Sequence, residues 1–143
     1  MSQTDVDVLI VGAGLSGIGA AWHLQDQCPG LAYLVLEARD AIGGTWDLFR
    51  YPGIRSDSDM HTLGYKFRPW RDDKAIADGP AIRAYVRDTA RAGGIDRQIR
   101  FRQRLREAHW DSDSAEWRLV IEDGDAGSTR ELRTGFLLMC AGY

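Results

Sequence analysis

Three glycines and a later glutamate stand at a spacing that suits the phosphates and ribose of a dinucleotide. Gly12, Gly14 and Gly17 follow the apolar run Val6–Val11, and Glu37 comes about 20 residues after the last glycine. In such a turn the first glycine permits a tight bend, the second lets a pyrophosphate approach the backbone, and the third lets the next helix pack closely on the strand. A carboxylate at this spacing accepts hydrogen bonds from ribose hydroxyls and repels a 2′-phosphate. The pattern therefore predicts a site for FAD or NAD rather than NADP.

The expected order of strand, helix and strand places the glycines and Glu37 where a dinucleotide would bind. The run Val6–Val11 is typical of a parallel strand covered on both faces. A helix is expected from about Gly14 to Cys28, and a second strand over Tyr33–Glu37. The start of the helix would direct free N–H groups and the positive end of its dipole at the phosphates. A glycine turn without a ligand is the competing interpretation, and the strand–turn–helix context argues against it.

The remainder of the chain alternates between loop, helix and strands. Residues 38–78 are rich in Gly, Pro, Asp and aromatic residues, and a loop region of this length is usually functional. A helix is expected after Asp78 and ends at Gly93-Gly94. Strands are then predicted at Gln98–Phe101, Leu105–Trp110, Glu116–Ile121, Thr129–Leu132 and Phe136–Cys140. The second to fourth of these form an antiparallel meander, and the last is of the parallel type. This order predicts an α/β fold, a Rossmann-like FAD-binding domain of the glutathione-reductase type over residues 1–143, with a parallel sheet and a three-stranded antiparallel β-meander.

Composition bounds the function further. A chain of 143 residues that is 44% hydrophobic and 27% charged has the composition of one globular domain. A net charge of −3 does not indicate the basic surface that binds nucleic acid. No apolar run in the sequence is long enough for a transmembrane segment. Cys28 and Cys140 lack metal-ligand or CxxC spacing, so no metal site is expected. Because the N-terminus is polar and acidic, it does not read as a signal peptide, and a cytoplasmic location is expected.

A second motif follows the glutamate. The segment Glu37–Asp59, EARDAIGGTWDLFRYPGIRSDSD, resembles the FAD-binding segment of class B flavoprotein monooxygenases, which include the Baeyer–Villiger and the flavin-containing monooxygenases. It is most similar to the actinobacterial Baeyer–Villiger branch that activates thioamide prodrugs. GGTW followed by RYPG and Asp57 is far more specific than the glycine turn alone. The resemblance extends over essentially all 143 residues.

The resemblance implies contacts to FAD for several residues. Ser16 would contact the pyrophosphate, Glu37 the adenosine ribose, and the backbone of Leu105 the adenine edge. The residues expected to line the path toward the flavin are Thr45, Trp46, Asp47 and Leu48. Some of these residues have alternative roles: Trp46 could fill the core, Arg39 could either stack on adenine or be a solvated surface residue, and Arg50-Tyr51-Pro52-Gly53 could be no more than a turn.

The resemblance also implies roles at the flavin end. Arg55, Ser56 and Asp57 match a segment that touches NADPH as well as FAD in the family. Asp57 is the candidate catalytic residue, since an aspartate at this place supports an active-site arginine in the family. Its alternative is a helix N-cap before the segment Ser58–Leu63.

The activity implied by the resemblance is oxygenation. NADPH reduces FAD and O₂ then forms a C4a-peroxyflavin, which inserts oxygen next to a ketone or oxygenates sulfur or nitrogen; the substrates are small ketones, sulfides or thioamides. A second glycine turn for NADPH, the FxGxxxHxxxW signature and the catalytic arginine do not occur in these 143 residues. We therefore expect the N-terminal FAD-binding portion without the NADPH domain, inactive alone. The alternatives are the FAD domain of an amine oxidase or an N-hydroxylating monooxygenase, and a stand-alone nucleotide-binding module.

Overall fold

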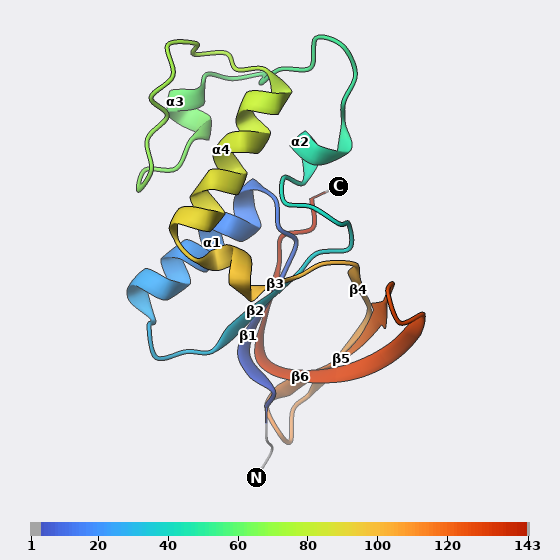
Figure 1. Cartoon of the computed structure of the whole chain (residues 1–143). Helices are drawn as coiled ribbons and strands as arrows, with labels where there is room; N and C mark the ends of the chain where they lie inside the picture. Colours follow the sequence, from blue (N-terminus) through green and yellow to red (C-terminus); the bar gives the residue numbers. More distant parts are fainter. Residues whose placement is uncertain (1–3, 143) are drawn as a thin grey trace.

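The computed structural model describes residues 4–142, whose strands form one six-stranded sheet in the order β3-β2-β1-β6-β5-β4 (Figure 1). In chain order the elements are β1 (Val6–Val11), α1 (Leu15–Gln27), β2 (Tyr33–Leu36), α2 (Thr45–Leu48), α3 (Met60–Leu63), α4 (Gly79–Ala92), the 3₁₀ helix η1 (Ile95–Gln98), β3 (Ile99–Arg100), β4 (Gln103–Asp111), β5 (Glu116–Asp123) and β6 (Ser128–Met139). The predicted α/β class, with its parallel core and antiparallel meander, is confirmed.

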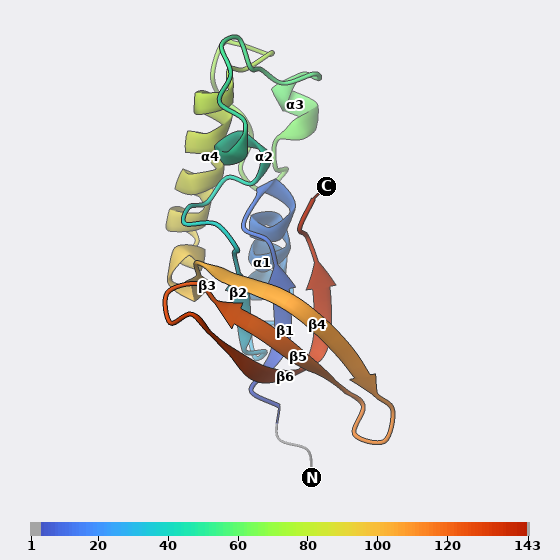
Figure 2. The same ribbon diagram turned by 90° about the vertical axis from the view of Figure 1, so that its right-hand side faces the viewer.

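The side chains of β1 alternate between two faces, so the strand packs against the helices on one side and against the antiparallel meander on the other. Val8 and Ile10 belong to the core cluster shared with α1 and α4, whereas Leu9 belongs to a second cluster with Leu119 and Leu132 of the meander. Because successive side chains of a strand point to opposite faces, an unbroken apolar run can bury both faces at once. Figure 2 shows the curved meander on the side of β1 away from the helices.

The last strand differs from the prediction. Thr129–Leu132 and Phe136–Cys140 were expected as separate strands, but β6 runs without interruption across both. Its first part is antiparallel to β5 and its second part is parallel to β1. Thr134 is fully buried and pairs with Val6 of β1 and with Trp117 of β5. Its hydroxyl donates a hydrogen bond to the Asp7 carbonyl oxygen at 3.2 Å. The strand therefore changes partners without a turn and leads from the meander back to the glycine turn.

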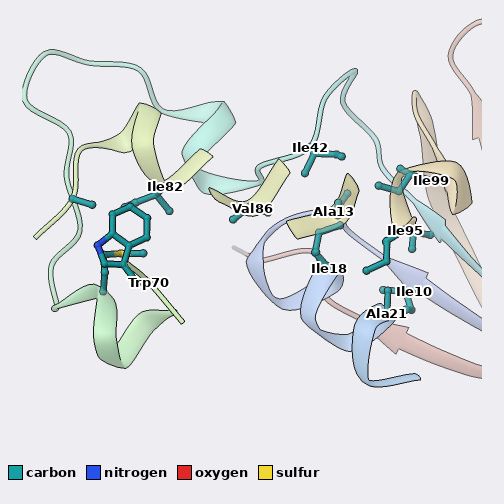
Figure 3. Packing of buried hydrophobic residues seen from close by; sticks show 14 of the residues in the cluster. Ile10, Ala13, Ile18, Ala21, Ile42, Trp70, Ile82, Val86, Ile95 and Ile99 are labelled. Atoms are coloured by element: carbon teal, nitrogen blue, oxygen red, sulfur yellow. The ribbon is translucent and has the colours of Figure 1, made fainter. Parts of the chain in front are cut away.

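The long segment between β2 and α4, predicted as a loop region, is mostly irregular and contains two short helices, α2 and α3. In the second, α3, the N-cap is Asp59, whose side chain accepts a hydrogen bond from Thr62 N. The suggested cap at Asp57 is therefore wrong, because that residue precedes the turn by two positions. Side chains from this segment, α1 and α4 fill one apolar cluster, in which Figure 3 shows Ile42, Ala13 and Val86.

Candidate dinucleotide-binding site

The glycine turn after β1 packs so tightly that side chains are excluded at two positions. A Cβ on Gly12, whose φ is +111°, would lie 2.2 Å from the Cys140 carbonyl oxygen. A Cβ on Gly17 would lie 1.8 Å from the Gly12 carbonyl oxygen. Backbone hydrogen bonds from Gly12 N to Leu36 O and from Cys140 N to Val11 O hold the turn between the ends of the neighbouring strands. The first and third glycines therefore have the structural roles that the motif predicted.

A cavity of about 270 Å³ opens at this turn, at the carboxyl ends of β1, β2 and β6. Most of the predicted cofactor residues meet there: Gly12, Gly14, Ser16, Glu37, Thr45, Trp46 and Leu48 line it. In parallel α/β sheets this end of the strands is where ligands bind. The cavity therefore brings together residues from the two motifs, which lie about 30 positions apart in the sequence.

The start of α1 supplies an anion-binding end to this cavity. Its first intrahelical hydrogen bond runs from Ile18 N to Gly14 O at 3.0 Å, so the N–H groups of Leu15, Ser16 and Gly17 precede the helical ladder. Leu15 and Ser16 line the cavity. The helix has 13 residues, and its dipole adds a partial positive charge at this end. A pyrophosphate fits the chemistry of this terminus.

Glu37 joins the glycine turn to the start of the loop after β2, at the wall of the cavity. Its side chain is only 7% exposed, and its two oxygens accept hydrogen bonds from Ala13 N at 3.0 Å and Arg39 N at 2.8 Å. Each carboxylate oxygen can accept more than one hydrogen bond, so both remain able to receive a ribose hydroxyl. The carboxylate thus stabilises the fold of the turn and faces the cavity.

The GGTW segment closes the opposite wall of the cavity. Gly44 has φ +56°, and a Cβ there would lie 2.9 Å from the Gly14 Cα. This close approach of two backbones carries α2 to the mouth of the glycine turn, where Thr45, Trp46 and Phe49 line the cavity. Trp46 lines the cavity and also packs against the core cluster, so its position is compatible with both interpretations, and its contact with a cofactor stays a prediction.

Asp47 is placed differently from its neighbours on α2. It is fully buried and is not among the residues that line the cavity. Its carboxylate binds the guanidinium groups of Arg39, Arg50 and Arg83. Burial alone would raise the pKa of Asp47, but the hydrogen bonds from Arg39 and Arg50 and the charge of Arg83 outweigh it and hold that pKa below its usual value.

The residues expected at the flavin end lie apart from this cavity. Arg55 lines an adjacent cavity of about 570 Å³, which shares Trp46 and Phe49 with the first. Ser56 is buried, and both its backbone N–H and its Oγ are engaged with the backbone of Ala77. Asp57 is exposed and lines neither cavity. Roles for these three residues in contacting NADPH or in catalysis stay predictions.

Leu105 also lies outside the cavity. It is on β4, at a register shift where Leu105 pairs with Ile121 and Glu107 pairs with Val120. The bulge leaves the backbone of Arg106 out of the regular ladder. The proposed reading of adenine by the Leu105 backbone stays a prediction.

Three consecutive lining residues at the end of β6 were not predicted, namely Cys140, Ala141 and Gly142, and neither were Leu15 and Phe49. Cys140, Ala141 and Gly142 follow β6, which is adjacent to β1, so the rule that ligands bind at the carboxyl ends of parallel strands was the signal that pointed to them. Burial raises the pKa of the Cys140 thiol, and a hydrogen bond with Ser16 partly offsets this. Among residues 4–142, no group of three or more His, Cys, Asp or Glu side chains is placed to hold a metal ion. No helix in the described part of the chain is both long and apolar enough to cross a membrane.

Comparisons with known proteins agree with this geometry. Residues 10–76 match the family model of an NAD(P)-binding Rossmann-like domain. The chain is 54% identical over 138 residues to the FAD-containing monooxygenase EthA of Mycobacterium tuberculosis, and 50% identical over 137 residues to the putative FAD-containing monooxygenase MymA of the same species. Both alignments cover 96% of this chain and 28% of the relative. The chain therefore spans a little over a quarter of the length of these relatives.

Solved structures show the same fold. An oxidized steroid monooxygenase bound to NADP superposes with a TM-score of 0.85 at 32% identity, covering 96% of this chain and 26% of that one. The structure of OTEMO in complex with FAD and NADP superposes with a TM-score of 0.86 at 26% identity, covering 99% of this chain and 26% of that one. The resemblance to FAD-dependent monooxygenases that GGTW and RYPG indicated is confirmed.

Proposed function

We propose that these residues form the FAD-binding portion of an NADPH- and O₂-dependent monooxygenase of the Baeyer–Villiger type. The observation that carries the proposal is a single cavity in which the glycine turn, the anchored carboxylate of Glu37 and the GGTW segment meet. A site for NAD alone would leave the GGTW wall unused. The named function of the relatives, FAD-containing monooxygenases, supports the same assignment.

The residues present fit FAD, and each has a separate task in holding it. The N-terminus of α1 and Gly14 would receive the pyrophosphate, and Glu37 the adenosine ribose. Thr45, Trp46 and Leu48 would lie along the part of the cofactor that leads to the flavin. When bound, FAD supplies the redox and oxygen-activating chemistry, while the protein binds it, orients it and excludes water.

The complete reaction is part of the proposal. NADPH would be the reductant, and the substrate a small ketone, sulfide or thioamide. Arg55, Ser56 and Asp57 would act at the flavin end, with Asp57 as the catalytic candidate, and Leu105 at the adenine. Both cysteines are free thiols, which is typical of a reducing compartment, so we place the enzyme in the cytoplasm.

Titration of the purified 143-residue chain with FAD, NAD⁺ and NADP⁺ tests the first step. We expect FAD to bind most tightly in calorimetry, with quenching of flavin fluorescence, because Glu37 repels the 2′-phosphate of NADP⁺ and NAD⁺ would leave the GGTW wall unused. Tighter binding of NADP⁺ than of FAD would contradict the proposal.

A pair of glycine variants tests the location. In Gly14→Val the new side chain would begin 3.3 Å from the Gly44 Cα and extend into the cavity, so FAD affinity should fall at least ten-fold. Gly30→Val makes the same substitution where nothing lies within 4 Å of the new Cβ, and it should leave affinity unchanged. Equal effects of the two substitutions would place the cofactor elsewhere.

A further inference from the structure

Asp47 collects three arginines from three separate segments of the chain. Its Oδ2 accepts from Nε and Nη2 of Arg39, at 3.2 and 2.9 Å. Its Oδ1 accepts from Nη2 of Arg50 at 2.7 Å and lies 2.9 Å from Nη2 of Arg83. Arg39 follows β2, Arg50 follows α2, and Arg83 belongs to α4. One buried carboxylate on α2 is therefore bound both to the segment after β2 and to α4.

The two carboxylate oxygens of Asp47 bind different arginines. Oδ2 is taken up entirely by Arg39, whereas Oδ1 binds Arg50 and Arg83. A buried carboxylate is stable only when it is well paired, and here three guanidinium groups face one carboxylate. The group as a whole carries two net positive charges beside the cavity in which an anionic ligand would sit.

Arg39 is the member of this group that reaches the cavity. Its backbone N–H is bound by Glu37 at 2.8 Å and its guanidinium by Asp47, so the residue is held at both ends. The side chain is 39% exposed, which leaves part of it accessible to a ligand. An arginine already fixed in place loses less freedom on binding, and its planar group can stack on a purine or contact a phosphate.

We propose that Asp47 is a positioning residue for the cofactor: it does not touch the cofactor, and it holds the guanidinium of Arg39 at the wall of the dinucleotide cavity. This inference rests on the proposed function for the identity of the ligand. The hydrogen bonds that carry it belong to the ligand-free protein, so they are measurable without FAD.

NMR of the arginine Nε–H groups in the ligand-free chain tests the positioning itself. Arg39 Nε donates to the Asp47 carboxylate, whereas Arg50 Nε donates to the Asp47 backbone carbonyl at 2.9 Å. In the wild type both signals should be protected from exchange with water. In Asp47→Ala only the Arg39 signal should lose protection, because the backbone acceptor of Arg50 is retained. Unchanged protection of Arg39, or an Arg39 signal that is unprotected in the wild type, would overturn the proposal.

A double-mutant cycle on FAD affinity tests the effect on the cofactor. Asp47→Ala and Arg39→Met should each weaken FAD binding about ten-fold, which corresponds to loss of one desolvated arginine contact. In the Arg39→Met background, Asp47→Ala should add less than two-fold. The control is Arg118→Met, which breaks an arginine–carboxylate pair with Glu131 on the meander and should leave affinity unchanged.

The outcomes of the cycle separate two roles for Asp47. If Asp47→Ala weakens FAD binding equally in both backgrounds, Asp47 acts as a general scaffold of α2 and the proposal is wrong. If Asp47→Ala does not fold, Arg39→Met decides alone, and an unchanged affinity would overturn the proposal. Failure of the wild type to bind FAD would contradict the proposed function, while the NMR result would still decide whether Asp47 positions Arg39.

Discussion

Replacing Glu37 by alanine should destabilise the protein even when no nucleotide is present. The side chain is nearly buried, and its carboxylate accepts hydrogen bonds from Ala13 N and Arg39 N. Alanine leaves both N–H groups without that acceptor, and the first of them is buried. The glycine turn and the start of the following loop should therefore lose their shared anchor.

The size of this effect follows from the two hydrogen bonds. A hydrogen bond to a charged group contributes about 1.5–3 kcal/mol, and the bond to Arg39 N is only partly buried, so we expect a loss of about 3–4 kcal/mol in the free energy of unfolding. The entropy of unfolding is about 2.1 cal/mol/K per residue, or about 0.3 kcal/mol/K for this chain. The midpoint of thermal unfolding should thus fall by about 10–13 °C.

Thermal unfolding of the ligand-free chain, followed by circular dichroism at pH 7, measures this shift. The matched control is Glu116→Ala on β5: Glu116 is 4% exposed, but its carboxylate makes one contact, 3.4 Å from Arg133, and its Oε2 is buried without a hydrogen-bond partner. Because the desolvation cost of this poorly paired carboxylate offsets its one ion pair, its removal should change stability by less than about 1 kcal/mol. A shift below about 3 °C for Glu37→Ala, or one equal to the control, would refute the view that this carboxylate supports the turn.

Three further outcomes follow from single groups. Gly17→Ala should unfold at a much lower temperature in circular dichroism, because its Cβ would lie 1.8 Å from a backbone oxygen and α1 would have to move; an unchanged midpoint would contradict the packing of the turn. Asp47 has a lowered pKa in the fold, so the stability that it contributes is complete above its ordinary value of 3.8 and is lost as the pH falls below it. Urea unfolding of wild type and Asp47→Asn across that range should show a flatter pH dependence for the variant. Burial raises the pKa of Tyr33 to about 12, so its contribution is complete below pH 10 and disappears as the pH rises to about 12. Tyr33→Phe should remove that part of the alkaline loss of stability, and an identical alkaline profile would show that Tyr33 ionises freely in the fold.

The sequence by itself determined the local features of the site. The positive φ of Gly12 and the close approach of Gly17 to the Gly12 carbonyl oxygen are properties of one turn, although the contact of Gly12 with Cys140 needs the neighbouring strand. The apolar run before the turn is enough to indicate a strand buried on both faces. Glu37 could be placed because the length of the intervening helix sets its distance from the turn. The GGTW and RYPG motifs then indicated a flavin-dependent monooxygenase, and the comparisons agree.

Only the tertiary structure decided how distant residues meet. The continuity of β6 depends on Thr134 pairing with β1 and β5 at once, which no local pattern in either half of the strand reports. The burial of Asp47 depends on arginines 8, 3 and 36 positions away, two of which lie on other segments. Spacing along the chain reports the period of a helix or strand, whereas a charged cluster of this kind forms only when packing brings the segments together.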